Sequence, residues 1–454
     1  MKKIPLFLMV AALVWACVPR DEITPSPFPS NLASEYSADF LRDWFKLECR
    51  VVKETPGFLP PQAARAFGYT GVTAYEAVYR GIPQAKSLAG QLNGFSPAAM
   101  PQADALSIRY HWGLVANAAV AEIMRLMFGK NLSEKNRILI NEKEEGYRVQ
   151  FTTEAASKAV ATLSQQLGKD IAAAVFEYSK GDGGHESYLN PFSKPFVAVT
   201  GDDKWVPTDA NNLTPLSPHW DRCRPMLASN MPFANPISPL KFSTHPQSDF
   251  YKAAMQVYTT VNRKSAEEQE IARYWADDPF ATCTPTGHTF NILTQLLEET
   301  GATLEKAAVG YGMLGVTEND AFITCWKVKY DYNLIRPVTY IQKYIDPSFK
   351  TVIGTPPFPA YTSGHATEAA AGERIFVKLF TNGDGAYPFT DRSQLQHGYS
   401  VRKFTNFKQM TEECADSRLY GGIHYDMDNQ LGLKMGRSLG DNVLKAITWP
   451  ENVK

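Results

Sequence analysis

Apolar residues recur at spacings of three and four along most of this chain, which is the period of one face of an α-helix. The first clear run is Phe40, Leu41, Trp44, Phe45, Leu47 and Val51. Comparable patterns cover about 62–80, 104–128, 134–180, 288–300, 302–315, 318–332, 364–380 and 427–447. Alternating patterns typical of strands are rare and short. The sequence therefore predicts a mainly α fold.

Residues 184–245 break the helical pattern. Nine prolines fall between positions 191 and 239, and little periodicity remains there. Because an unstructured connector of this length is uncommon in a compact protein, we expect an ordered, irregular, Pro-rich loop layer. It would separate two helical bundles, over 36–183 and 246–454, the second of which carries the chemistry. Within that second bundle, Thr317-Glu-Asn-Asp320 resembles a helix N-terminus.

The N-terminus has the pattern of an export signal. Two lysines precede an apolar run over 4–16, which is too short to span a bilayer. The run ends in Val14-Trp-Ala-Cys17, which resembles a bacterial lipobox. We therefore expect a signal peptide over 1–16, lipid attachment at Cys17, a membrane-anchored tether over 17–35 and a place in the cell envelope. The alternative is a plain signal peptide in which the cysteine occurs by chance.

Charge and cysteine content exclude some classes of protein. The chain carries 46 Lys and Arg against 47 Asp and Glu, so no basic field favours nucleic acid as a partner. Besides Cys17, the cysteines are odd in number and widely spaced, at positions 49, 223, 283, 325 and 414. This spacing is neither that of a disulfide framework nor that of a zinc site. The sequence allows one or two disulfides but does not determine their pairing. It does not determine the oligomeric state either.

Three clusters in the last third of the chain indicate an oxyanion site. They are Lys329-x6-Arg336-Pro, Ser363-Gly364-His365 and Ser417-Arg418-x3-Gly-x-His424-x3-Asp428. The two arginines offer planar forks for bidentate contacts, and the lysine adds a compact charge. Together these side chains suit phosphate or a phosphate mimic.

The same clusters supply groups that can transfer protons. Ser363 and Gly364 precede a predicted helix, so a helix N-terminus would present N–H groups to the anion. Of the two histidines, one can act as nucleophile or metal ligand and the other as acid or base. Asp428 follows His424 by four residues, on the same helical face if a helix runs there, and could orient the imidazole.

The order and spacing of these clusters resemble the signature shared by vanadium-dependent haloperoxidases and type-2 phosphatidic acid phosphatases. Thr362 stands where that superfamily usually has proline. Segments farther upstream, including Tyr274-Trp-Ala-Asp-Asp278 and a motif that ends at His288, look like those of bacterial haloperoxidases. Both Tyr274 and His288 are candidate pocket residues, although a packing role is favoured for each.

The resemblance implies vanadate as cofactor, with hydrogen peroxide and a halide as substrates. His424 would bind vanadium, and His365 would be the acid or base that handles protons of the peroxide. The residues that would hold the vanadate oxygens are Lys329, Arg336, Ser363, Gly364 and Arg418. Bacterial vanadium iodoperoxidases are the most similar type, so iodide is the expected halide and bromide the second choice.

A soluble acid phosphatase is the alternative function. It would use the same cradle, with His424 attacking phosphorus to form a phosphohistidine. The length of the chain favours a haloperoxidase, as do Trp326 and Phe358, which look like the aromatic pair beside the halide in chloroperoxidase-type and iodoperoxidase-type pockets. Plain core packing is the other interpretation of these two aromatic side chains.

Overall fold

The computed structural model describes residues 30–102, 109–192, 196–197, 199–208, 213–381, 383 and 385–453. The predicted signal peptide and Cys17 lie outside the described residues, so export and lipid attachment stay predictions. Residues 30–35, expected at the end of the tether, pack instead on the helical body. Tyr110 donates its backbone N–H to Ser30 Oγ at 2.8 Å, and Trp112 Nε1 donates to the carbonyl of Asn31 at 2.8 Å.

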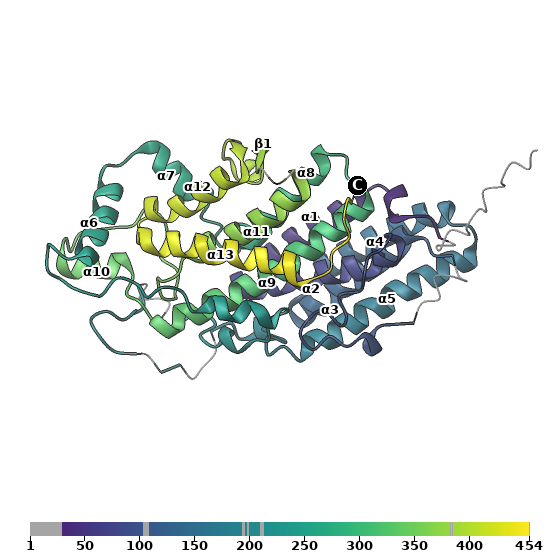
Figure 1. The fold of residues 1–454 in the computed structure, drawn as a ribbon, viewed down its shortest axis with the longest axis horizontal. Helices are drawn as coiled ribbons and strands as arrows, with labels where there is room; N and C mark the ends of the chain where they lie inside the picture. Colours follow the sequence, from purple (N-terminus) through teal and green to yellow (C-terminus); the bar gives the residue numbers. More distant parts are fainter. Residues whose placement is uncertain are drawn as a thin grey trace, which may run out of the picture.

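The mainly α prediction is confirmed. The first half of the chain contributes α1 (Asp39–Glu54), α2 (Pro60–Val78), α3 (Trp112–Phe128), α4 (Glu134–Glu154) and α5 (Lys158–Lys180). The molecule is elongated, with α4 and α5 toward one end and α6 (Asp249–Asn262) and α10 (Pro337–Tyr344) at the other (Figure 1). Among the described residues, no helix combines the length and apolar character that crossing a membrane requires.

The remaining helices belong to the second half of the chain. They are α7 (Ala266–Tyr274), α8 (Thr284–Glu299), α9 (Leu304–Tyr332), α11 (Gly364–Phe380), α12 (Phe407–Tyr420) and α13 (Asp426–Ala446). A small antiparallel sheet pairs β1 (Ala386–Asp391) with β2 (Arg402–Asn406), with Phe389 opposite Phe404. Short 3-10 turns occur at Ala33–Glu35, Tyr79–Gly81, Pro97–Ala99, Gly129–Asn131, Ser187–Leu189, Trp220–Arg222, Ala228–Ala234 and Leu395–His397.

Helix α9 is one continuous helix, where the sequence pattern predicted two. The expected helix N-terminus at Thr317 is therefore wrong. Thr317 Oγ1 instead donates back to the carbonyl of Met313 at 2.8 Å, a bond that a threonine inside a helix commonly makes. The helix ends where Asn333 takes a left-handed conformation (φ 51°), and Arg336 then caps the start of α10.

Helix α9 joins the two halves of the molecule because it packs along α2 through small residues. A Cβ atom on Gly71 of α2 would lie 2.2 Å from the carbonyl oxygen of Tyr311, and one on Gly315 would lie 2.9 Å from the carbonyl oxygen of Gly68. Buried apolar residues of α1, α2, α3, α5, α8, α9 and α11 form one continuous core. The helices of the two predicted bundles thus share a hydrophobic interior.

The described residues between 184 and 245 form turns that pack on α9. Buried Asp320 of α9 accepts hydrogen bonds from the backbone N–H groups of Met226 (2.7 Å) and Leu227 (2.8 Å) and from Asn230 Nδ2 (2.8 Å). Burial nevertheless raises the pKa of Asp320 to about 6. Backbone hydrogen bonds to loops hold the segment elsewhere, as between Trp205 N and the carbonyl of Asn333 at 2.8 Å and between Leu216 N and the carbonyl of Pro357 at 2.9 Å.

The glycine contact between α2 and α9 yields a test of the packing. We expect Gly71→Ala to lower the free energy of unfolding by about 2–3 kcal/mol, because backbone atoms of α9 cannot move away from the new methyl group cheaply. Gly146→Ala is the matched control, since Gly146 is exposed on α4 with open space around it. That change is expected to stabilise the protein by up to about 1 kcal/mol. Urea unfolding of both variants measures the difference, and equal effects would contradict the close approach of α2 and α9.

Candidate active site

Residues from all three sequence clusters meet where several helices begin or end. Lys329 lies in the last turn of α9 and Arg418 in the last turn of α12. The remaining members are Arg336 at the start of α10, Ser363 and Gly364 at the start of α11, and His424 and Asp428 at the start of α13. We call these seven residues together with His365 the cradle. Buried aromatic residues surround it, among them Phe250, Trp326, Tyr340, Tyr361 and Tyr425.

The Lys329 ammonium group is fully buried and is held by backbone carbonyls. Its Nζ donates to the carbonyl oxygens of Pro359 (3.1 Å), Ala360 (3.0 Å) and Thr362. Burial, which opposes the charged form, and the neighbouring Arg336 lower the pKa of Lys329 to about 7. This lysine can therefore change its charge near neutral pH.

Arg336 and His424 are in direct contact. Arg336 Nη1 lies 3.0 Å from His424 Nε2, and His424 Nδ1 lies 2.9 Å from Asp428 Oδ2. Because arginine can only donate, Nε2 must accept and Nδ1 must carry the proton. Burial and the charges of Arg336 and Lys329 keep the pKa of His424 well below its ordinary value. The neutral imidazole thus has a lone pair on Nε2, as a metal ligand or nucleophile requires.

The contact between His424 and Asp428 is made differently from the sequence prediction. Helix α13 begins at Asp426, so His424 precedes the helix and does not share a helical face with Asp428. Asp428 Oδ2 instead accepts from the backbone N–H of Tyr425 at 3.2 Å as well as from the imidazole. The carboxylate that caps the helix therefore also orients the histidine. Burial raises the pKa of Asp428 to about 7.

Arg418 and His365 both contact the loop after α7. Arg418 Nη1 donates to the carbonyl of Trp275 at 2.6 Å, and the His365 imidazole is hydrogen-bonded to the backbone of Ala276. Burial and the nearby charges of Arg418 and His288 hold the pKa of His365 well below its ordinary value. Both cradle histidines are therefore neutral at pH 7.

Ser363 and Gly364 form the helix N-terminus that the sequence predicted. Ser363 Oγ accepts the N–H of Ala366 at 3.4 Å, and the backbone N–H of Ser363 donates to the carbonyl of Asp428 at 3.0 Å. The first N–H groups of α11 have no partner within the helix, and a helix N-terminus favours an anion.

Three buried nitrogen atoms of the cradle have no hydrogen-bond partner within the described part of the chain. They are Arg336 Nη2, Arg418 Nε and His365 Nε2. Buried polar atoms are almost always paired in folded proteins. Two guanidinium donors and one imidazole nitrogen therefore fit a ligand that carries several oxygen atoms.

Trp326 and Phe358 lie together beside Lys329, and their place at a halide pocket stays a prediction. Their ring centroids are 5.0 Å apart, and Lys329 Nζ lies 5.0 Å from the centre of the Phe358 ring. Trp326 Nε1 donates to the carbonyl of Leu216 in the Pro-rich segment at 3.3 Å. Both side chains are buried and apolar at the edge of a cationic site.

His288 and Tyr274 do not join the cradle but belong to a buried polar network behind it. His288 Nδ1 lies 3.0 Å from Asp277 Oδ2, and His288 Nε2 lies 2.9 Å from Asp391 Oδ2. Although burial opposes it, the two carboxylates raise the pKa of His288 well above its ordinary value. Tyr274 OH donates to Asp391 Oδ2 at 2.8 Å. Trp275 stacks on His288, with ring centroids 4.6 Å apart.

This network fixes the loop whose backbone contacts Arg418 and His365. Asp277 is part of that loop, and the sequence pattern gave no sign that Asp391, 103 residues beyond His288, would complete the arrangement. No motif spacing links positions so far apart. Only the position of β1 beside α8 brings Asp391 to His288.

Both the sequence and the fold of this chain are similar to those of known proteins. A family model described as the VCPO second helical-bundle domain matches residues 311–449. A crystal structure described as the first bacterial vanadium-dependent iodoperoxidase is similar at 30% identity and a TM-score of 0.82, over 92% of this chain and 99% of that one. The chain belongs to the vanadium-dependent haloperoxidase family. Membership implies vanadate as the cofactor and hydrogen peroxide and a halide as substrates, and the unpaired donors of the cradle fit an oxyanion of this kind.

Two further structures show the same fold at lower similarity. They are the holo-type and apo-type forms of a bacterial vanadium-dependent chloroperoxidase, each 14% identical with a TM-score of 0.59. The holo-type form matches over 87% of this chain and 95% of its own, and the apo-type form over 86% and 94%. No curated protein sequence is matched.

The low pKa of Lys329 predicts how vanadate binding depends on pH. A bound oxyanion stabilises the ammonium form, so the complex holds this proton more tightly than the free protein. Affinity is therefore expected to fall as the pH rises through about 7, by at most about tenfold per pH unit for this group. Titration calorimetry between about pH 6 and pH 8 measures the decline. Lys329→Met should bind more weakly below pH 7 and show a shallower decline, whereas Lys327→Met, at a half-buried lysine of the same helix, should match wild type.

The network around His288 predicts that a substitution outside the cradle will weaken vanadate binding. His288→Asn removes the cation between Asp277 and Asp391, so the loop that positions Arg418 and His365 loses its support. We expect a loss of vanadate affinity of about 10- to 100-fold, as outer-shell changes at metal sites usually cause. His245→Asn, at an exposed histidine outside the network, is the control. A lower melting temperature with unchanged vanadate affinity would mean that the network stabilises only the fold.

Proposed function

We propose that this chain is a vanadate-dependent haloperoxidase that oxidises iodide, and bromide less readily. Hydrogen peroxide, the halide and one proton would give hypohalous acid and water. The observation that carries this proposal is the neutral His424, whose Nε2 accepts from Arg336 Nη1 in a site where Arg336 Nη2 and Arg418 Nε are buried without a partner among the described residues. Vanadate bound there would supply a Lewis acid that activates hydrogen peroxide toward the halide.

Each cradle residue has a role that its contacts support. His424 would bind vanadium through Nε2 once Arg336 donates to the oxyanion instead, and Asp428 would keep the Nδ1 proton in place. Arg336 and Arg418 would hold oxygens through charge-assisted hydrogen bonds. Ser363 and Gly364 would add the dipole of the α11 N-terminus.

Lys329 and His365 would act on the peroxide. The Lys329 charge would stabilise negative charge as it develops on the leaving oxygen. His365 is neutral and its Nε2 has no partner among the described residues, so it can take a proton from incoming hydrogen peroxide and return it to the product. Both residues would therefore touch the reacting atoms.

Support for iodide comes from similarity and from chemistry. The bacterial iodoperoxidase is 30% identical over nearly its full length, whereas the chloroperoxidase is 14% identical. Iodide is also the halide most easily oxidised, so it makes the smallest demand on the site. Trp326 and Phe358 would line the halide side, where apolar rings beside Lys329 favour a large and weakly hydrated anion.

The test compares peroxide-dependent oxidation of iodide, bromide and chloride by the purified protein with and without orthovanadate. We expect vanadate-dependent iodide turnover that exceeds bromide turnover. His424→Ala should reduce it by more than the roughly 10- to 100-fold that outer-shell changes cost. Exposed His245→Ala should leave turnover unchanged and serves as the matched control.

Other outcomes of the same assay would contradict parts of the proposal. Bromide or chloride turnover above that of iodide would overturn the halide assignment alone. Hydrolysis of p-nitrophenyl phosphate by the vanadate-free protein, inhibited by vanadate and without halide oxidation, would identify the phosphatase chemistry instead. Full iodide turnover in His424→Ala would mean that the metal ligand is another residue.

A further inference from the structure

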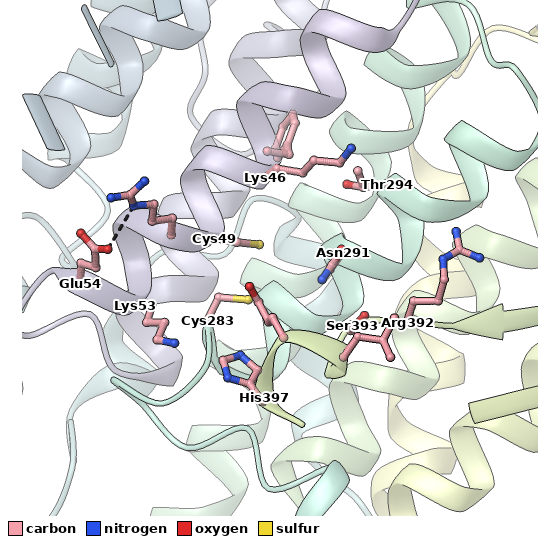
Figure 2. Close-up of a pocket in the computed structure, with 14 residues that line it drawn as sticks. Lys46, Cys49, Lys53, Glu54, Cys283, Asn291, Thr294, Arg392, Ser393 and His397 are labelled. Carbon is pink, nitrogen blue, oxygen red and sulfur yellow. Dashed lines mark hydrogen bonds and ion pairs between the residues drawn. The ribbon is translucent and has the colours of Figure 1, made fainter. Parts of the chain in front are cut away.

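A second site lies away from the cradle, in a cavity of about 550 Å³ between α1, the start of α8 and the segment after β1. Figure 2 shows Cys49 and Cys283 on facing elements of this cavity, with Lys53 and His397 nearby. None of the cavity's lining residues belongs to the cradle. We propose that Cys49 and Cys283 are a redox-active pair that hydrogen peroxide converts to a disulfide.

The two sulfur atoms meet at one glycine. Cys49 Sγ donates to the carbonyl of Gly287 at 3.6 Å, on the same turn of α8 that Cys283 faces. A Cβ atom on Gly287 would lie 2.6 Å from Cys283 Sγ, so a larger residue would displace that sulfur. The first turn of α8 therefore provides the space in which the sulfurs approach each other.

Access distinguishes this pair from the other described cysteines. Cys49 and Cys283 are both partly exposed, whereas Cys223, Cys325 and Cys414 are buried. A small oxidant dissolved in water can reach the pair through the cavity. Hydrogen peroxide, which the family uses as a substrate, is such an oxidant, and this chemistry needs neither vanadate nor the cradle.

The surroundings assign a role to each sulfur. Cys283 is the residue before the first turn of α8, where the positive end of the helix dipole lies, and Lys53 lines the same cavity. The interaction with neighbouring Cys283 and burial raise the pKa of Cys49 well above its ordinary value. Cys283 is therefore the attacking sulfur, and Cys49 is the thiol that reacts second.

The two steps balance with one molecule of peroxide. The Cys283 thiolate attacks one peroxide oxygen, the S–O bond forms, and the O–O bond breaks to release hydroxide, which takes up a proton as water. Cys49 then attacks the sulfenic acid sulfur, the S–S bond forms, and the S–O bond breaks to release a second water. Two thiols are oxidised by two electrons, and one peroxide is reduced. The disulfide would tie α1 to the N-terminus of α8.

The test uses the reduced, vanadate-free protein, so that it is independent of haloperoxidase activity. After treatment with about one equivalent of hydrogen peroxide, we expect the intact mass to fall by about 2 Da, the mass of two hydrogen atoms. Digestion without reduction should yield a peptide that links Cys49 to Cys283. The melting temperature should rise, because a link between distant positions restricts the unfolded chain, and dithiothreitol should reverse the rise.

Single substitutions complete the experiment. Cys49→Ser and Cys283→Ser should each abolish the linked peptide, and buried Cys414→Ser should retain it. The wild-type peptide map decides the question even if a variant fails to fold. Two freely alkylated thiols after peroxide treatment, separate oxidation of each cysteine to sulfinic acid, or a link to another cysteine would each overturn the proposal.

Discussion

The burial of three cationic side chains in one site is the constraint on which the structure of the catalytic half depends. Lys329, Arg336 and Arg418 are each almost completely removed from water, and burial opposes the charged form of all three. Removing a charge from water costs several kcal/mol unless the protein or a ligand replaces its hydration. An oxyanion bound in the cradle would lower that cost, and the unpaired donors show where it would be held.

The hydrogen bonds that replace water around these cations come mainly from backbone carbonyls rather than from carboxylates. The segment from Phe358 to Thr362 offers carbonyl oxygens to Lys329 and Arg336, Ile423 offers one to Arg336, and Trp275 offers one to Arg418. Carbonyl dipoles hold an ammonium or guanidinium group without neutralising it. The positive charge is thus kept for an anionic ligand, and this explains why irregular segments between helices, rather than the helices themselves, complete the cradle.

The sequence predicted features that depend on residues close together in the chain better than features that depend on tertiary contacts. The cradle residues lie in three short clusters whose spacing identifies them, and the structure brings those residues together. The single helix α9 was mispredicted because Thr317-Glu-Asn-Asp320 resembles a helix N-terminus, whereas Thr317 lies inside the helix and its Oγ1 donates to the carbonyl of Met313. The contact between His424 and Asp428 was expected, but it arises from a helix cap rather than from a helical face.

The sequence by itself determined the mainly α fold, the membership of the cationic cradle and the helix N-terminus at Ser363, because periodicity and motif spacing are local properties. Only the tertiary structure decided that Asp277, His288 and Asp391 form one network, that Cys49 meets Cys283, and that α9 carries Lys329 from the shared core into the site. These contacts join positions far apart in the chain. They exist because burying apolar helix faces brings those positions together, and local sequence patterns do not predict how the helices pack.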